Sequence, residues 1–433
     1  MSEKIKLFLT RNRLFDFDGC LCFEACCKKP LDKEQVNKAL KMLFIHLPLL
    51  GSAVELAENG DAFVVPGVVE PVAEFLQGDV CEIIKEKTEK GLLFSEKLFS
   101  FCVVNEKTLL LFGHTVAFDM RSLMIAAEEF ISYYERERLS VEPWGTELFS
   151  DLFSLPSNVM SPVIERVASD LDIGWQKKTA FFSVADYVRA KKKFEDKRKP
   201  LVTLRAELSE AELNALGGFA QANGVDSSSV VGFCFYEKLG EVFASEKRKF
   251  KKMNVVSNNR VFFENEEKYR VGPFDGLATV FLKRKNNDLN GVDKIKAFHS
   301  EVYKKLTSSF TVFYNDFLHA KVSPSFCDSA YMYCAGEWNH KYSARLAKTY
   351  GCASKVMGEL STYNLTQDYW QGLKRFESVR MHDSLRMRSE TGVTFVMSDG
   401  KGDIQFSFRC DKLSEKQGER VFEEAVLMLK SLL

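Results

Sequence analysis

The sequence has little of several features that mark common classes of protein. Histidine and proline are scarce, with 6 and 10 residues among 433, so few side chains titrate near neutral pH. Lysine plus arginine equals aspartate plus glutamate, 60 against 60, which leaves no net charge to attract nucleic acid or an anionic membrane. No apolar run approaches the ~20 residues that cross a bilayer, and the charged start is not typical of a signal peptide. We therefore expect a cytoplasmic chain with no nucleic-acid partner and no transmembrane segment.

The 11 cysteines lack the spacing of a metal site or a disulfide framework. There is no C-x-x-C pair, and the count is odd, so we interpret them as free thiols in a reducing compartment. The densest group lies in residues 20–27, where Cys20 and Cys22 alternate as in a strand, and we expect no metal there. Glycine-rich phosphate loops and a nucleophilic serine elbow are also missing.

The chain does have the composition of a globular protein with large cores. Hydrophobic residues make up 45% of it and 37 residues are phenylalanine, which is enough for two or three packing units. Residues 1–160 and 200–433 both carry strand and helix patterns. Between them, residues 161–199 have weak periodicity and end in a basic run before Pro200, so we interpret this segment as a solvated crossover linker.

Several local signals predict where elements begin and end. Asp32 before Gln35, Ser209 before Glu212 and Ser414 before Gln417 each predict the start of a helix through N-terminal capping. Gly224 predicts a helix end, and the turn at residues 399–402 predicts a hairpin between two alternating strands.

The most informative stretch is residues 107–135, KTLLLFGHTVAFDMRSLMIAAEEFISYYE. The apolar run Leu109–Phe112 predicts a strand buried on both faces, and the spacing of apolar residues after position 122 predicts a helix packed on the core. The short turn between them carries His114 and Asp119. An imidazole beside a carboxylate on rigid elements is a candidate general base.

This stretch resembles the active-site segment of the superfamily that includes chloramphenicol acetyltransferases, BAHD-type alcohol acyltransferases and the condensation domains of peptide synthetases. The family pattern is H-H-x-x-x-D-G, and the chain has His114-Thr115-Val116-Ala117-Phe118-Asp119-Met120. With Asp119 aligned on the family aspartate, His114 falls on the first histidine and Thr115 on the second, which is the usual base. The segments at 44–50, 255–260 and 356–364 and the terminal hairpin and helix also resemble superfamily members.

The resemblance implies an α/β (α+β) fold of two chloramphenicol-acetyltransferase-like halves, each a mixed sheet covered by helices, with a tunnel between them. It implies transfer of an acyl group from a thioester, on coenzyme A or a carrier protein, to a hydroxyl or amine. The enzyme would be an acyl-CoA-dependent O-acyltransferase without a tightly bound cofactor, acting as a monomer. The roles implied for individual residues are His114 as base, Asp119 as brace of the turn, Ser361 and Asn364 as oxyanion stabilisers, Thr115 and Ser122 as tunnel lining, and Lys249, Lys251, Lys252 and Arg260 as phosphate ligands of coenzyme A.

An alternative of a different class stays open: a catalytically silent member of this fold that binds a protein partner or acts as a scaffold. The loss of the second histidine at Thr115 and of glycine at Met120 is what decay of a catalytic turn produces. Because neighbouring strand residues point to opposite faces, an imidazole displaced by one position turns away from the tunnel unless a bulge intervenes.

Overall fold

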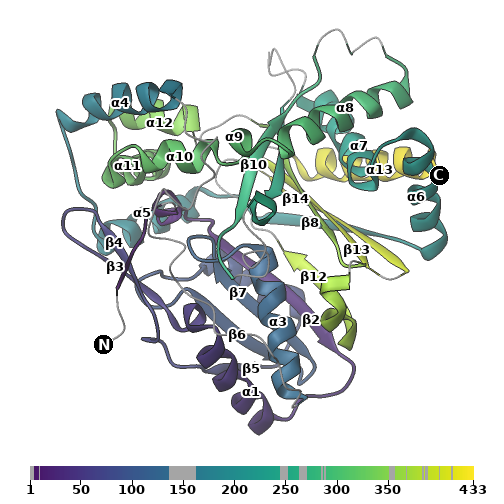
Figure 1. Ribbon diagram of the computed structural model, residues 1–433, viewed down its shortest axis with the longest axis horizontal. Helices are drawn as coiled ribbons and strands as arrows, with labels where there is room; N and C mark the ends of the chain where they lie inside the picture. Colours follow the sequence, from purple (N-terminus) through teal and green to yellow (C-terminus); the bar gives the residue numbers. More distant parts are fainter. Residues whose placement is uncertain are drawn as a thin grey trace.

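The computed structural model describes residues 4–8, 10–135, 162–243, 252–262, 271–283, 286, 289–350, 356–366, 368–382, 385, 389–398, 400–410 and 413–433. These residues form two halves, each built on one large sheet, together with a separate group of helices (Figure 1). Both large sheets contain parallel and antiparallel neighbours, as the mixed-sheet prediction requires.

The N-terminal half is built on a five-stranded sheet of order β12-β2-β7-β6-β5. Its strands are β2 (Cys20–Cys27), β5 (Ala73–Leu76), β6 (Phe99–Val104), β7 (Thr108–His114) and β12 (Phe376–His382). Helices α1 (Lys33–His46) and α3 (Met120–Tyr134) cover one face, and α2 (Val80–Lys90) packs on the other. A small sheet of β1 (Ile5–Lys6), β4 (Ala62–Val65) and β3 (Ala53–Leu56) lies at one side. β7 is buried along its whole length, which confirms the prediction for Leu109–Phe112.

The C-terminal half is built on a six-stranded sheet of order β10-β9-β11-β13-β14-β8. Its strands are β8 (Leu201–Leu208), β9 (Met253–Asn258), β10 (Asp275–Val280), β11 (Gly358–Asn364), β13 (Thr391–Ser398) and β14 (Lys401–Arg409). One face carries an apolar core shared with α6 (Glu210–Asn223), α7 (Ser227–Val242), α8 (Gly291–Leu306) and α13 (Glu415–Lys430). Among the described residues, the opposite face of this sheet carries no part of that core.

Two features of the structure differ from the predicted division of the chain into an N-terminal half, a linker and a C-terminal half. β12 comes from the second half of the chain yet pairs with β2, so it completes the N-terminal sheet. The expected solvated linker instead contains α4 (Pro162–Gln176) and α5 (Val184–Lys197), with Trp175 and Tyr187 almost fully buried. α4 packs with α10 (Tyr314–Ala320) and α12 (Lys341–Tyr350), and α5 packs with α11 (Pro324–Ala335). The basic run is thus mostly one face of a packed helix, and the linker interpretation was wrong.

The predicted helix and turn signals are confirmed. Asp32, Ser209 and Ser414 each accept a hydrogen bond from a backbone N–H of the helix that follows, and Gly224 ends α6 with φ of 66°. The hairpin of β13 and β14 closes at Gly400, which has φ of 73°. The ten cysteines in the described part of the chain are free thiols. Within the same residues no side-chain group with the composition of a metal site is found, and no helix is long and apolar enough to span a membrane.

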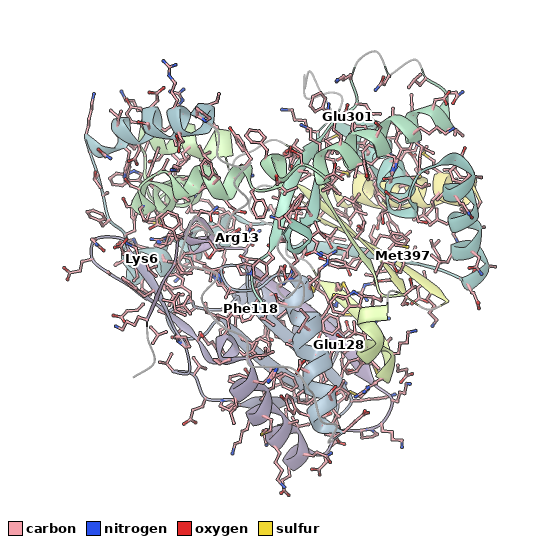
Figure 2. All side chains as sticks on the ribbon, viewed as in Figure 1. Lys6, Arg13, Phe118, Glu128, Glu301 and Met397 are labelled. Carbon is pink, nitrogen blue, oxygen red and sulfur yellow. The ribbon has the colours of Figure 1, made fainter. Side chains whose placement is uncertain are left out.

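Residues 10–18 run through the middle of the molecule and are buried despite their charge. Cys20 and Cys22 lie in strand β2, as their alternation predicts, and residues 11–13 before it form a short 3-10 helix (η1, Arg11–Arg13). Arg11 contacts Asp328 of α11 at 2.6 Å, and Arg13 contacts Asp275 of β10 at 2.5 Å. Arg13 lies where the two halves and the helical group meet (Figure 2). This segment therefore ties together parts of the chain that are remote in sequence.

Candidate functional site

The turn from β7 to α3 is organised by Asp119. This residue is the N-cap of α3, and its Oδ1 accepts a hydrogen bond from the backbone N–H of Ser122 at 2.8 Å. The hydroxyl of Ser122 lies 2.7 Å from the same oxygen. A carboxylate at a helix N-terminus satisfies free N–H groups and faces the positive end of the helix dipole, which explains the sharp start of α3.

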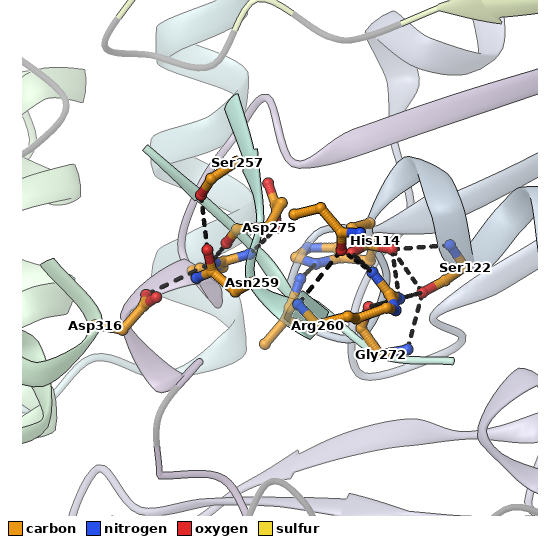
Figure 3. Close-up of polar contacts among 12 residues, drawn as sticks. His114, Ser122, Ser257, Asn259, Arg260, Gly272, Asp275 and Asp316 are labelled. Atoms are coloured by element: carbon orange, nitrogen blue, oxygen red, sulfur yellow. Dashed lines mark hydrogen bonds and ion pairs between the residues drawn. The ribbon is translucent and has the colours of Figure 1, made fainter. Parts of the chain in front are cut away.

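Arg260 of the C-terminal half completes this arrangement (Figure 3). Its Nη2 donates to Asp119 Oδ1 and to Ser122 Oγ, both at 2.9 Å, while Nη1 donates to the second carboxylate oxygen. The backbone N–H of Gly272 donates to Ser122 Oγ at 2.8 Å. Asp119 therefore makes both hydrogen bonds within the turn and an ion pair with Arg260, and the ion pair joins the two halves.

The position of Arg260 corrects one prediction. We expected this guanidinium to contact the phosphates of coenzyme A, but the residue is 1% exposed and two of its nitrogens bind Asp119. A phosphate would have to displace a buried, bidentate carboxylate, which is costly. Of the lysines expected beside it, Lys249 and Lys251 lie outside the described residues, and Lys252 is exposed just before β9.

His114 is buried at the end of β7 and is 2% exposed. Its Nδ1 accepts the backbone N–H of Val116 at 3.1 Å, and its ring meets Phe94 edge-on at 6.5 Å between centroids. Burial, with the charge of Lys191 as a smaller cause, lowers the pKa of His114 to about 3. The ring is therefore neutral at physiological pH, and its Nε2 has no hydrogen-bond partner among the described residues.

The strand register shows which way this ring is directed. His114 lies opposite Cys20 of β2 and shares its strand face with Phe112, on the side of the sheet where Ile84 of α2 packs. Phe94, which covers the ring, also contacts Tyr187 of α5 at 5.0 Å between centroids. The imidazole is thus enclosed by aromatic side chains of the N-terminal half and by α5.

Thr115, which takes the place of the usual base, is also enclosed. It is 1% exposed, and its hydroxyl has no hydrogen-bond partner among the residues that the structure describes. A Cβ added to Gly19 would lie 2.7 Å from Thr115 Oγ1, so the hydroxyl packs directly on the backbone before β2. A hydroxyl is in any case a poor proton acceptor near neutral pH.

Ser361 and Asn364, the predicted oxyanion donors, differ in their surroundings. Ser361 is 3% exposed and lies on the β11 face opposite Leu360, which packs in the C-terminal core. Tyr363 shares that face and lies beneath the guanidinium of Arg121 from α3, so Ser361 is directed towards the N-terminal half. Asn364 instead accepts hydrogen bonds from the N–H and hydroxyl of Thr366, at 3.0 and 2.6 Å, in a local turn.

Ser361 belongs to a row of polar residues that crosses the C-terminal sheet. Ser361, Thr394, Gln405 and Arg205 are paired in register across β11, β13, β14 and β8. The sequence alternates polar and apolar residues in β14, a pattern usually assigned to a solvent-exposed face. Here the polar face is covered: Gln405 is 4% exposed and Thr394 is 5% exposed. The alternation of polar and apolar residues therefore does not reveal that this polar surface is buried between the halves.

A second polar cluster was missed because its members are far apart in the sequence. His382 of β12 lies 2.8 Å from Glu24 of β2, and Arg205 of β8 lies 3.3 Å from the other ring nitrogen. Burial by itself raises the pKa of Glu24, but the hydrogen bond and charge of His382, with nearby arginines, lower it on balance. Arg380 and Asp403 beside this cluster line a cavity of about 290 Å³. This cavity lies between β12 of one half and β14 of the other.

Comparison with known proteins supports the fold. No family model matches the chain, and no curated protein matches its sequence. Among solved structures, the epimerization domain from the third module of tyrocidine synthetase B has a TM-score of 0.64 at 13% identity, covering 100% of this chain and 96% of that one. The cyclization-docking bidomain of EpoB, a nonribosomal peptide synthetase from Sorangium cellulosum, also has a TM-score of 0.64 at 13% identity, covering 98% and 84%. The first condensation domain of the calcium-dependent antibiotic synthetase has a TM-score of 0.63 at 11% identity, covering 100% and 96%.

The chain therefore has the two-lobed fold of condensation domains. The same fold occurs in epimerization, cyclization and condensation domains of peptide and polyketide synthetases. At this level of identity the likeness establishes architecture, and activity has to be argued from the site.

Proposed function

We propose that this chain is a binding protein built on the acyltransferase fold, and that it does not transfer acyl groups through a histidine base. The observation that carries the proposal is the state of His114. It is the imidazole of the degenerate motif, it is 2% exposed, and burial lowers its pKa to about 3.

The low pKa weakens a base as well as keeping it neutral. A general base works best when its pKa lies near the working pH, because it then combines the correct protonation state with a useful affinity for the proton. When the pKa of an imidazole falls from 6.5 to about 3, the ring binds a proton far more weakly than an ordinary histidine does. A neutral amine or alcohol would also have to reach a nitrogen enclosed by Phe94 and its neighbours.

The polar contacts at the junction between the halves are extensive. The Asp119–Arg260 ion pair fixes the start of α3 against the C-terminal half, and the buried polar row through Ser361 faces the same junction. We infer that an acyl thioester, carried by coenzyme A or by a carrier protein, occupies this junction. Lys252, with Lys249 and Lys251, remains the proposed contact for its phosphates.

The test compares transfer with binding on the same protein. Wild type, His114→Ala and Thr115→His are incubated with a panel of acyl-CoA thioesters and a loaded carrier protein, with simple alcohols and amines as acceptors. We expect no thiol release above background from wild type or His114→Ala, together with measurable calorimetric binding of a thioester to both. A wild-type rate that His114→Ala abolishes would contradict the proposal.

A second candidate, acyl transfer with His114 as base, is favoured by the intact Asp119, Ser122 and Arg260 arrangement. In that case the turn would shift by one residue, His114 would take the proton from the acceptor, and the acceptor oxygen or nitrogen would attack the thioester carbonyl. The tetrahedral intermediate would then collapse with cleavage of the C–S bond, and the protonated His114 would return the proton to the leaving thiolate. Ser361 or Asn364 would stabilise the oxyanion. This function predicts a wild-type rate that falls at low pH with an apparent pKa well above 3, which the enclosed ring does not provide.

A further inference from the structure

A cavity with a volume of about 730 Å³ lies in the N-terminal half, away from the Asp119–Arg260 arrangement. This size falls within the range of small-molecule sites. Its walls come from α2, from the loop that joins α2 to β6, and from α5. We name it the α2–α5 cavity.

The lining of the α2–α5 cavity has two kinds of surface. Apolar and aromatic side chains form one part, with Phe112 and Tyr187 each 1% exposed and Leu92 7% exposed beside Leu93 and Val188. Charged side chains form the other part: Lys87, Lys90, Lys97, Lys191, Lys192, Glu74, Glu96 and Glu195. Five lysines against three glutamates give a formal charge of 5 − 3 = +2.

Some of these charges neutralise one another within the wall. Glu74 accepts from Lys87 at 2.6 Å and lies 3.6 Å from Lys97, while Lys191 lies 3.5 Å from Glu195. The side chains of Lys90 and Lys192 have no carboxylate partner within the described residues, and both are exposed at the cavity. Lys87 and Lys97 share Glu74 and keep one positive charge, Lys90 and Lys192 add two, and Glu96, for which no cationic partner is found among the described residues, offsets one. The exposed ammonium groups of Lys90 and Lys192 are the ones available to a ligand.

Lys191 is held in place between these two surfaces. Its Nζ donates to the carbonyl of Lys90, the last residue of α2, where the negative end of the helix dipole attracts a cation. Gly91 makes this approach possible: its φ is 65°, and a Cβ there would lie 2.5 Å from Lys191 Nζ. The ammonium group of Lys191 therefore lies beside the apolar part of the lining. Its positive charge helps to lower the pKa of His114.

We propose that the α2–α5 cavity binds an anionic amphiphile, a ligand with an alkyl chain and a single carboxylate or phosphate head. The chain packs on Leu93 and Val188, the apolar lining side chains that are not buried, above Phe112 and Tyr187. The head group meets Lys90 and Lys192 at the opening. This site is separate from the junction between the halves, so the inference does not rest on the proposed function.

The experiment measures binding of dodecanoate, dodecyl phosphate and dodecyltrimethylammonium to the full chain by calorimetry, below their micelle concentrations. Wild type is expected to bind one or both anions and not the cation; the tighter anion identifies the head group. Lys90→Glu/Lys192→Glu is expected to weaken that binding about tenfold, since two exposed charges are reversed. Lys85→Glu, an exposed lysine of the same helix that does not line the cavity, is the matched control and leaves the affinity unchanged.

A variant of the floor tests the apolar part. Val188 is 47% exposed and lines the cavity, so Val188→Asp places a carboxylate beside the chain without disturbing a buried core. We expect it to weaken binding of the anion at least as much as the double lysine variant. Equal binding of the alkyl cation, no binding of either anion, or an affinity that the lysine and Val188 variants do not change would each overturn the proposal.

Discussion

Single buried charges dominate the behaviour expected at the scale of the residue. Asp119 and Arg260 are 3% and 1% exposed, so neither charge has water to compensate for the loss of its partner. Replacing one member of such a pair is far more costly than replacing both, because the remaining ion stays buried and unneutralised.

We expect Asp119→Asn to lower the free energy of unfolding by about 3–5 kcal/mol. Asparagine keeps a hydrogen-bond acceptor for the N-cap of α3, so the loss reports mainly the charge opposite Arg260. The measurement is urea denaturation of wild type, Asp119→Asn, Arg260→Met and the double variant. If the two single losses simply add in the double variant, the ion pair is not the source of the stability.

A second residue, Glu129 of α3, gives a prediction about pH. Burial raises the pKa of Glu129 from 4.5 to about 7, and burial lowers that of His46, whose Nε2 lies 3.8 Å away. Both groups therefore favour their neutral forms. A carboxyl whose pKa is raised in the folded state contributes stability below its unfolded pKa, and this contribution is lost as the pH rises from 4.5 through about 7.

Glu129→Gln removes this dependence because the amide does not ionise. At pH 8 we expect the variant to be more stable than wild type by roughly 2–3 kcal/mol, and at pH 5 by less than about 1 kcal/mol. Denaturant unfolding at the two pH values measures the difference. Glu86→Gln on the exposed face of α2 is the control, and the prediction fails if Glu129→Gln behaves like it at both pH values.

At the scale of the element, close packing between β7 and α3 explains a glycine next to the motif. A Cβ on Gly113 would lie 2.9 Å from Leu123 Cδ2 and 3.1 Å from Phe118 Cβ. The backbone of Gly113 therefore packs directly against the side chains of Leu123 and Phe118, and there is no room for a methyl group. This contact fixes the path of the chain on either side of His114.

We expect Gly113→Ala to destabilise the protein by about 1–3 kcal/mol through overpacking. Gly217 in α6 supplies the matched control, since a Cβ there would have nothing within 4 Å. Gly217→Ala should stabilise by about 0.5–1 kcal/mol, because alanine favours a helix interior. Thermal unfolding of both variants measures the contrast, and shifts of the same sign would show that packing at β7 does not decide the outcome.

Elements defined by local chemistry could be predicted from the sequence. The starts of α1, α6 and α13 follow from capping residues within one turn, and the final hairpin follows from its glycine turn. The helix α5 was not predicted because its exposed side carries a run of lysines, a composition that is typical of a solvated linker. Its burial depends on Tyr187 packing against Phe15 and Phe94, residues about 100 or more positions away.

The site was predictable only where one segment carried it. Asp119 was assigned as the brace of the turn from the motif, but its partner Arg260 is 141 positions away and was assigned to phosphate. The pairing of His382 with Glu24 spans 358 positions and has no local signature. The direction of the His114 ring depends on the register of β7 in the sheet. The sequence shows that His114 and Thr115 point to opposite faces of the strand, but it does not show which face is enclosed.

At the scale of the whole molecule, buried ion pairs and strand β12 connect the two halves and the group of helices. Arg11 pairs with Asp328 of the helical group, Arg13 pairs with Asp275 of the C-terminal half, and β12 from the second half of the chain completes the first sheet. Arg205 and His382 add a polar contact between β8 and β12. These links are distributed over the junction, so neither half presents a complete surface without the other.

This arrangement predicts a single cooperative unfolding transition for wild type, because losing one half exposes buried charges on the other. Arg11→Met/Arg13→Met removes two cations from the junction while retaining apolar side chains of similar length. We expect the variant to lose several kcal/mol and to unfold in two steps, with near-ultraviolet and far-ultraviolet circular dichroism no longer coincident. Lys4→Met, which removes an exposed ion pair with Glu55, should keep the single transition, since such pairs contribute about 0–1 kcal/mol. Coincident transitions in the double variant would mean that the links it retains, which are strand β12, the Asp119–Arg260 ion pair and the Arg205–His382 contact, are enough to couple the halves.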